Sequence, residues 1–77
     1  MHAKLKKILK AVFNLTDSEI DNAHSRDDIA SWDSLKHMEL VILMEREFHI
    51  SLTVEEIIEL ETISDIQNLL LKKGMPN

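Results

Sequence analysis

Three residues near position 34 have the types and spacing that nucleophilic catalysis uses. Asp33, Ser34 and His37 fall within five positions, and residues three apart are neighbours on a helix. A serine hydrolase also needs an oxyanion hole and a substrate cleft, and its base must be oriented by a third group. A short chain without strand patterns provides no evident place for these, so we do not predict a hydrolase.

The same segment suggests a metal site only weakly. Asp33 and His37 are four residues apart, and His2, His24 and His49 could in principle join them. None of these spacings matches a known ligand set, and the absence of cysteine removes thiolate ligands. We predict no metal site and expect all four histidines at the surface.

The length of the chain allows one small domain, 1–77, with a short tail at 72–77. At 77 residues, about 60 to 65% of the unfolded chain's surface can be buried on folding. Leu40–Met44 is the longest apolar run, far below the roughly 20 residues that span a bilayer, and residues 1–15 lack a signal-peptide pattern. We expect a cytoplasmic protein without stable membrane insertion.

The net charge of −5 is distributed unevenly. The first ten residues contain four lysines and no acid, whereas residues 11–71 contain fourteen acids and three basic residues. An acidic body repels phosphodiester backbones and attracts basic protein surfaces. We therefore expect no nucleic-acid binding and a partner with a basic face.

Helix is the strongest structural signal. Gly74 and Pro76, the chain's glycine and proline, lie near the end, and no period-2 alternation is present. We predict an all-α four-helix bundle with a short third helix and a long loop between helices 1 and 2. The first helix carries one apolar stripe, Leu5, Ile8, Leu9, Val12 and Phe13. Its lysines suit either a solvated face or a membrane surface, and core packing of the stripe favours the former.

Residues 14–32 form the long connection. Thr16 and Glu19 have capping-box spacing, which predicts a single helical turn. Ile20 and Ile29 are expected to pin the loop to the core. Trp32 either packs over the core or contacts a molecule that binds near Ser34. Connections of this length are often functional.

The second helix is predicted from Ser34 to Phe48, with Asp33 as its N-cap. One row of apolar residues suits the core: Leu40, Val41, Met44 and Phe48. A second row, Leu35, Met38 and Ile42, is rotated away from it. Either this helix is buried on most sides, or the second row is left for a partner.

Two capped helices complete the chain. Thr53 and Glu56 form a capping-box pattern before a short helix, and Thr62 opens the last one. The short helix is expected to make apolar contacts through Val54, Ile57, Ile58 and Leu60. The last helix carries Ile63, Ile66, Leu69 and Leu70 and ends at Lys72, Lys73 and Gly74.

Several of these segments together resemble the acyl carrier protein family, which includes peptidyl carrier domains. Asp-Ser-Leu at 33–35 is followed by Met-Glu-Leu at 38–40 and Glu-Arg-Glu-Phe-His-Ile at 45–50. The resemblance extends over nearly the whole chain. It implies that Ser34, flanked by Asp33, carries 4'-phosphopantetheine donated by coenzyme A through a separate, magnesium-dependent phosphopantetheinyl transferase. The terminal thiol would hold acyl or aminoacyl thioesters, so the protein would be a carrier and not an enzyme.

The resemblance also gives the second apolar row a role. It implies that Leu35, Met38 and Ile42 dock partner enzymes, with Trp32 nearby. The acids expected to steer basic partners are Glu39, Glu45 and Glu47. The partners would be the transferase, a loading ligase and downstream synthase or transferase enzymes, and the carrier would be a monomer.

Two departures from the family pattern indicate a specialised carrier. Ala30-Ser31-Trp32 stands where the family often has glycine, and Leu35–Phe48 has a net charge of only −1. The first indicates a tryptophan-containing subgroup with a differently shaped loop. The second favours a dedicated acyl or aminoacyl pathway, because the resemblance implies a strongly acidic second helix for housekeeping fatty-acid carriers. The alternative is a small helical adaptor without a prosthetic group, in which Ser34 only begins a helix.

Overall fold

The computed structural model describes residues 1–22 and 26–75. These residues form α1 (Ala3–Phe13), α2 (Asp17–Asn22), the 3-10 turn η1 (Arg26–Asp28), α3 (Ser34–Phe48), α4 (Val54–Glu59) and α5 (Ile63–Lys72). The all-α prediction is confirmed. The predicted number of four helices is one too low, because the turn expected after Thr16 continues through Asn22 as α2.

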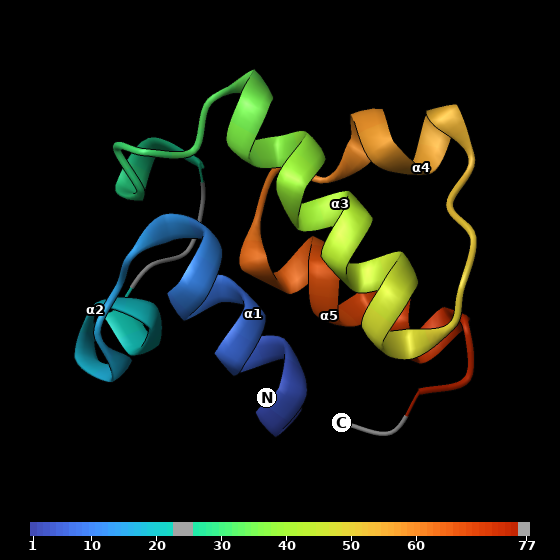
Figure 1. Cartoon of the computed structure of the whole chain (residues 1–77), viewed down its shortest axis with the longest axis horizontal. Helices are drawn as coiled ribbons and strands as arrows, with labels where there is room; N and C mark the ends of the chain where they lie inside the picture. Colours follow the sequence, from blue (N-terminus) through green and yellow to red (C-terminus); the bar gives the residue numbers. More distant parts are fainter. Residues whose placement is uncertain (23–25, 76–77) are drawn as a thin grey trace.

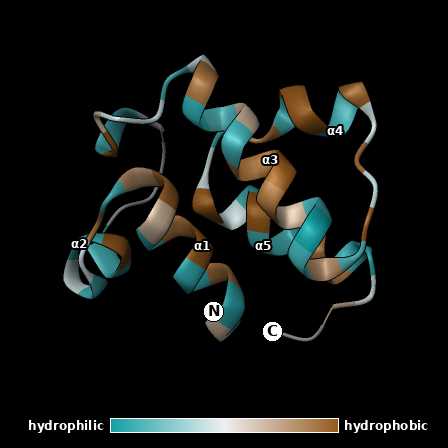
Figure 2. Ribbon diagram, viewed as in Figure 1, coloured by the Kyte–Doolittle hydropathy of each residue, from teal (hydrophilic) through white to brown (hydrophobic). Residues whose placement is uncertain are grey.

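The long helix α3 lies between the other elements, with α1 on one side, α4 on the other and α5 behind it (Figure 1). The α1 stripe is buried in full, which confirms its assignment to the core. Leu40, Val41, Met44 and Phe48 of α3 are buried as predicted. Their partners in α5 are Ile63, Ile66, Leu69 and Leu70. Hydrophobic residues accordingly line the inner faces of the helices in Figure 2.

Side-chain caps begin the main helices where the sequence placed them. The Asp33 carboxylate accepts a hydrogen bond from the Lys36 N–H, and Thr53 and Thr62 complete capping boxes with Glu56 and Asp65. Each cap satisfies backbone donors that have no partner within the helix. These local interactions fix where α3, α4 and α5 begin.

The connection between α1 and α3 is attached to the core at two points. Ile20 and Ile29 are buried, as predicted. The Thr16 capping box is also present, since the Thr16 N–H donates to Glu19 and the Glu19 N–H donates to the Thr16 hydroxyl. Asp17 pairs with Lys10 at 3.0 Å, which ties α2 to α1. The loop therefore follows a defined path to Ser34.

The short helix α4 differs from its prediction. Val54 and Ile58 are exposed, so they do not make the expected core contacts, whereas Ile57 is half-buried and Leu60, just after the helix, is buried. No residue within α4 is buried. In fewer than two turns, α4 places Ile57 against the core and leaves Val54 and Ile58 on the outward side.

The helices within residues 1–22 and 26–75 include none that is both long and apolar enough to cross a membrane.

Candidate functional site

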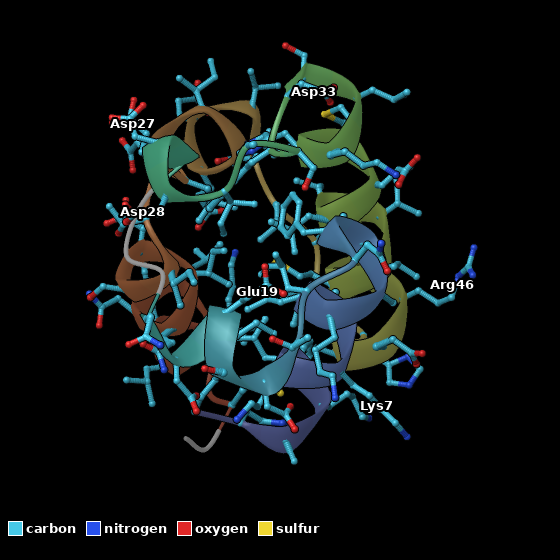
Figure 3. The ribbon with its side chains drawn as sticks, turned by 90° about the vertical axis from the view of Figure 1, so that its left-hand side faces the viewer. Lys7, Glu19, Asp27, Asp28, Asp33 and Arg46 are labelled. Carbon is cyan, nitrogen blue, oxygen red and sulfur yellow. The ribbon has the colours of Figure 1, made fainter. Side chains whose placement is uncertain are left out.

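Ser34 is the first residue of α3 and is exposed at one end of the molecule. Its neighbour Asp33 lies at that end, beside the first turn of α3 (Figure 3). The Asp33 carboxylate caps the helix by accepting from the Lys36 N–H at 2.9 Å. Within the described residues the Ser34 hydroxyl has no hydrogen-bond partner, so it is available for modification.

His37 does not form a catalytic pair with Ser34. It is 7% exposed, which corrects the prediction of a surface histidine. Its Nδ1 lies 2.9 Å from Trp32 Nε1, and its Nε2 lies 2.7 Å from the Ile57 carbonyl oxygen. Both ring nitrogens are therefore occupied, and the Asp33, Ser34, His37 arrangement provides no general base for the serine.

Trp32 is buried rather than available to a partner. Only 5% of its surface is exposed, and its ring centroid lies 5.1 Å from that of Phe13 at the end of α1. This geometry corrects its inclusion among the docking residues and supports the alternative of a loop residue packed over the core. Its contribution to the site is to hold the backbone that precedes Ser34.

The second apolar row of α3 is left on the surface. Leu35, Met38 and Ile42 are 68%, 44% and 51% exposed. They face away from Leu40, Met44 and Phe48, which fill the core. Of the two interpretations of this row, the structure therefore supports the one in which it is free for a partner.

The three acids predicted to steer partners lie in different surroundings. Glu39 is beside the row and pairs with Lys36 at 3.3 Å. Glu45 is half-buried, and its carboxylate accepts from the Leu52 N–H at 2.9 Å, so it holds the segment before α4. Glu47 is about 140° around the helix from Ile42, on the side facing α1. It lines a groove there with Lys4 and Lys7. Glu39 and Glu45 are each three residues from Ile42 and so flank the exposed row, whereas Glu47 does not.

Sequence reasoning missed an apolar pair on α4. Val54 and Ile58 are 67% and 68% exposed, and α4 lies beside the first half of α3 (Figure 1). Their spacing of four residues indicated one face of a helix, but not that this face points outward. The half-buried Ile57 and the His37 bond to its carbonyl determine the orientation.

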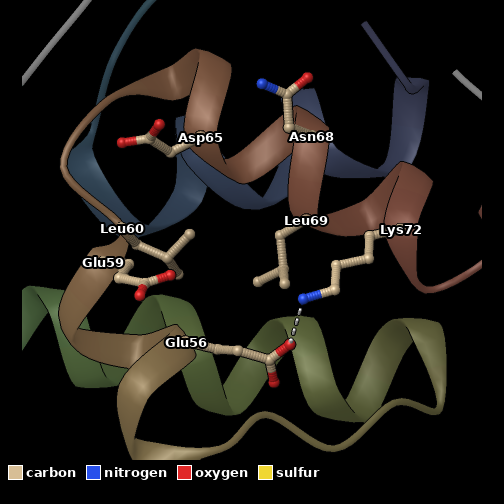
Figure 4. A pocket seen from close by; sticks show the side chains of 7 residues that line it. All are labelled: Glu56, Glu59, Leu60, Asp65, Asn68, Leu69 and Lys72. Atoms are coloured by element: carbon tan, nitrogen blue, oxygen red, sulfur yellow. Dashed lines mark ion pairs between the residues drawn. The ribbon is translucent and has the colours of Figure 1, made fainter.

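The groove between α4 and α5 is not a catalytic site. Its lining includes three carboxylates, and Lys72 lies across it, 3.9 Å from a Glu56 oxygen (Figure 4). Ser34 is not among the lining residues. No group of three or more potential metal ligands occurs in the described part of the chain, which does not include His24.

Comparison with known proteins identifies the family. A family model described as "Phosphopantetheine attachment site" matches residues 3–70. The chain belongs to this family. It is also 32% identical over 74 residues to a protein named "Acyl carrier protein" from Bdellovibrio bacteriovorus, covering 96% of this chain and 95% of that one. No solved structure was found that matches it significantly.

Membership decides between the two predicted classes of function. Family members are carriers to which 4'-phosphopantetheine is attached covalently, and they are not catalysts. The chain is thus a carrier protein, and an adaptor without a prosthetic group is disfavoured. The exposed hydroxyl at the start of α3 fits such a group, because an attached chain can extend into solvent without displacing the core.

Proposed function

We propose that Ser34 is the attachment point of 4'-phosphopantetheine and that the chain shuttles acyl or aminoacyl thioesters between enzymes. The observation that carries the proposal is the exposed, unbonded hydroxyl of Ser34 at the first position of α3, inside a chain that matches the family over residues 3–70. The group, when bound, supplies the thiol that this cysteine-free chain lacks.

The start of α3 suits the charge of the linkage. The first backbone N–H groups of a helix have no carbonyl partner within it and carry the positive end of its dipole. A phosphodiester on Ser34 would lie next to them, which favours its negative charge. The Asp33 carboxylate opposes that charge, but it is already engaged by the Lys36 N–H.

The apolar row of α3 supports a docking role. Leu35, Met38 and Ile42 begin one residue after Ser34, so an enzyme that contacts them holds the modified serine close to its own active site. Val54 and Ile58 of the neighbouring α4 extend the apolar surface available to it. Glu39 is paired with Lys36, which leaves this face nearly neutral and favours a specialised pathway with dedicated enzymes.

The partners in this proposal are a phosphopantetheinyl transferase, a loading ligase, and downstream synthase or transferase enzymes. A shuttle must present α3 to each of them in turn. We therefore expect a monomer, and we place it in the cytoplasm, where coenzyme A is used.

Incubation with coenzyme A and a broad-specificity phosphopantetheinyl transferase, followed by intact-mass measurement, tests the attachment. The wild type should gain the mass of one phosphopantetheine, and Ser34→Ala should gain none. An unmodified wild type, or an adduct that persists in Ser34→Ala, would refute the proposal.

The docking role is tested by placing a charge on the apolar row. Ile42→Glu should weaken binding of the transferase by about 1 to 3 kcal/mol, which is typical of a central interface residue. Leu71→Glu is the matched control, because Leu71 is 48% exposed and lies on α5. Equal losses in both variants would show that the row has no special role.

A further inference from the structure

A chain of hydrogen bonds joins three segments next to Ser34. The Trp32 indole N–H donates to His37 Nδ1 at 2.9 Å, and His37 Nε2 is 2.7 Å from the Ile57 carbonyl oxygen. Trp32 belongs to the loop before Ser34, His37 to the first turns of α3 and Ile57 to α4. We call these three residues the latch.

The latch requires one tautomer of His37. An indole N–H can only donate, so Nδ1 must accept, and a carbonyl oxygen can only accept, so Nε2 must carry the proton. The neutral imidazole satisfies both bonds at once. The ring planes of Trp32 and His37 are 21° apart with centroids 6.0 Å apart, which suits a bond lying near the plane of both rings.

The latch matters because apolar packing reaches α4 mainly through the half-buried Ile57 and through Leu60, just after the helix. None of its six residues is buried. Polar links add to this packing: Glu56 pairs with Lys73 at 3.1 Å and with Lys72 at 3.9 Å, and the Leu52 N–H donates to Glu45 just before the helix. Among the polar links named here, the latch is the one that joins α4 to the loop before Ser34, through the Trp32 side chain.

We propose that Trp32 and His37 are positioning residues that fix α4 relative to Ser34. Resting on the function proposed above, this means that a partner enzyme meets the α3 row and the α4 pair, Val54 and Ile58, in one fixed arrangement. Without the latch, α4 would move relative to the serine, and each enzyme would have to restore the arrangement on binding.

Two variants remove the bonds while changing the packing little. Trp32→Phe keeps an aromatic ring against Phe13 but loses the N–H donor, and His37→Leu loses both ring nitrogens. In the transferase assay Trp32→Phe should raise KM for the carrier by about five- to tenfold, the usual effect of one lost hydrogen bond, and His37→Leu, which loses two, should raise it at least as much, with kcat unchanged. His37→Gln has one donor and one acceptor and should restore a KM close to that of the wild type.

A purely structural role would give a different pattern. Val12→Ala, a core substitution in α1 that leaves the three latch residues unchanged, provides a control for lost stability. If KM for Trp32→Phe matches the wild type, or if Val12→Ala raises KM equally at equal loss of stability, the proposal is wrong. Should His37→Leu fail to fold, Trp32→Phe and His37→Gln still decide the question.

Hydrogen exchange in the unmodified protein tests the latch without the prosthetic group. Trp32→Phe and His37→Leu should increase exchange of the α4 amides several-fold while leaving the α1 amides unchanged. Long-range proton–nitrogen spectra of the wild type should show His37 protonated at Nε2 alone. Unchanged exchange of the α4 amides, or a proton on His37 Nδ1, would refute the latch even if Ser34 is modified. A wild-type protein that accepts no phosphopantetheine would refute only the proposed function.

Discussion

At the scale of single residues, Asp33 and Ser34 have separate tasks. The side chain of Asp33 turns back to the Lys36 N–H and begins α3, while the hydroxyl of Ser34 stays unbonded at the surface. Serine is itself a common N-cap, and in that position its hydroxyl would be engaged by the backbone. Because the aspartate takes the cap, the next residue is left free to carry a group.

Replacing Asp33 should therefore destabilise the fold without removing the modifiable serine. Asp33→Ala should lower the free energy of unfolding by about 1 kcal/mol, the typical cost of losing an N-cap. Urea unfolding followed by circular dichroism measures this change. Asp33→Asn keeps an acceptor and should lie within a few tenths of a kcal/mol of the wild type. If both variants lose the same stability, the charge of Asp33 matters and its capping bond does not.

At the scale of elements, α4 is held by polar links as well as by packing, and Glu56 makes the polar link to the end of α5. Its Oε1 accepts from the Thr53 N–H at 2.9 Å and lies 3.1 Å from Lys73 Nζ. The hydrogen bond from the Thr53 N–H lowers the pKa of Glu56 most, and the hydrogen bond from Lys73 comes next. The charges of Lys73 and Lys72 lower it further, and together these effects outweigh desolvation, which raises it. One carboxylate thus caps α4 and joins it to α5.

This pKa shift predicts an acid-sensitive contribution to stability. A carboxyl group whose pKa is lower in the folded state stabilises the fold fully above its unfolded pKa, near 4.5, and loses that effect as the pH falls through the folded pKa. Glu56→Gln should therefore be less stable than the wild type at pH 7, and the difference should shrink below about pH 4.5. Thermal unfolding of both proteins from pH 7 to pH 3 measures this. A difference that stays constant with pH would contradict the assignment.

At the scale of the whole molecule, the sequence predicted what local patterns determine. The α1 stripe, the caps at Asp33, Thr53 and Thr62, and the bounds of α3 depend on near neighbours in the chain, and all are confirmed. The resemblance to the carrier family around Ser34 also depends on a local motif, Asp-Ser-Leu at 33–35.

What was missed depends on distant contacts. The bond between His37 and Ile57 joins residues 20 positions apart. The helical spacing did hold one signal, because His37 precedes Leu40 and Val41 by three and four residues and so shares their buried face. Val54 and Ile58 were assigned to the core because a short helix shows an apolar face without showing which way it points.

Several acids lie on the side of the molecule that carries Ser34. In Figure 3, Asp33 and Asp27 lie toward the end where α3 begins, Asp28 lies below Asp27 on the same side, and Lys7 and Arg46 lie farther away. On α1, Lys6 and Lys10 are paired with acids of α2, at 3.2 Å to Asp21 and 3.0 Å to Asp17. A partner with a basic face should therefore be steered toward the Ser34 end.

Two variants with the same change in net charge test this steering. Asp27→Lys changes the charge at the Ser34 end, and Glu47→Lys changes it near the opposite end of α3, about 20 Å along the helix. Stopped-flow mixing with the transferase at low salt should show association slowed about threefold by Asp27→Lys and little by Glu47→Lys, because steering acts on the association rate. The difference should vanish at about 0.5 M NaCl, where the screening length is shorter than the distance between the surfaces. Equal rates for the two variants at low salt would mean that only the net charge of the carrier matters and that the acidic end does not guide its partners.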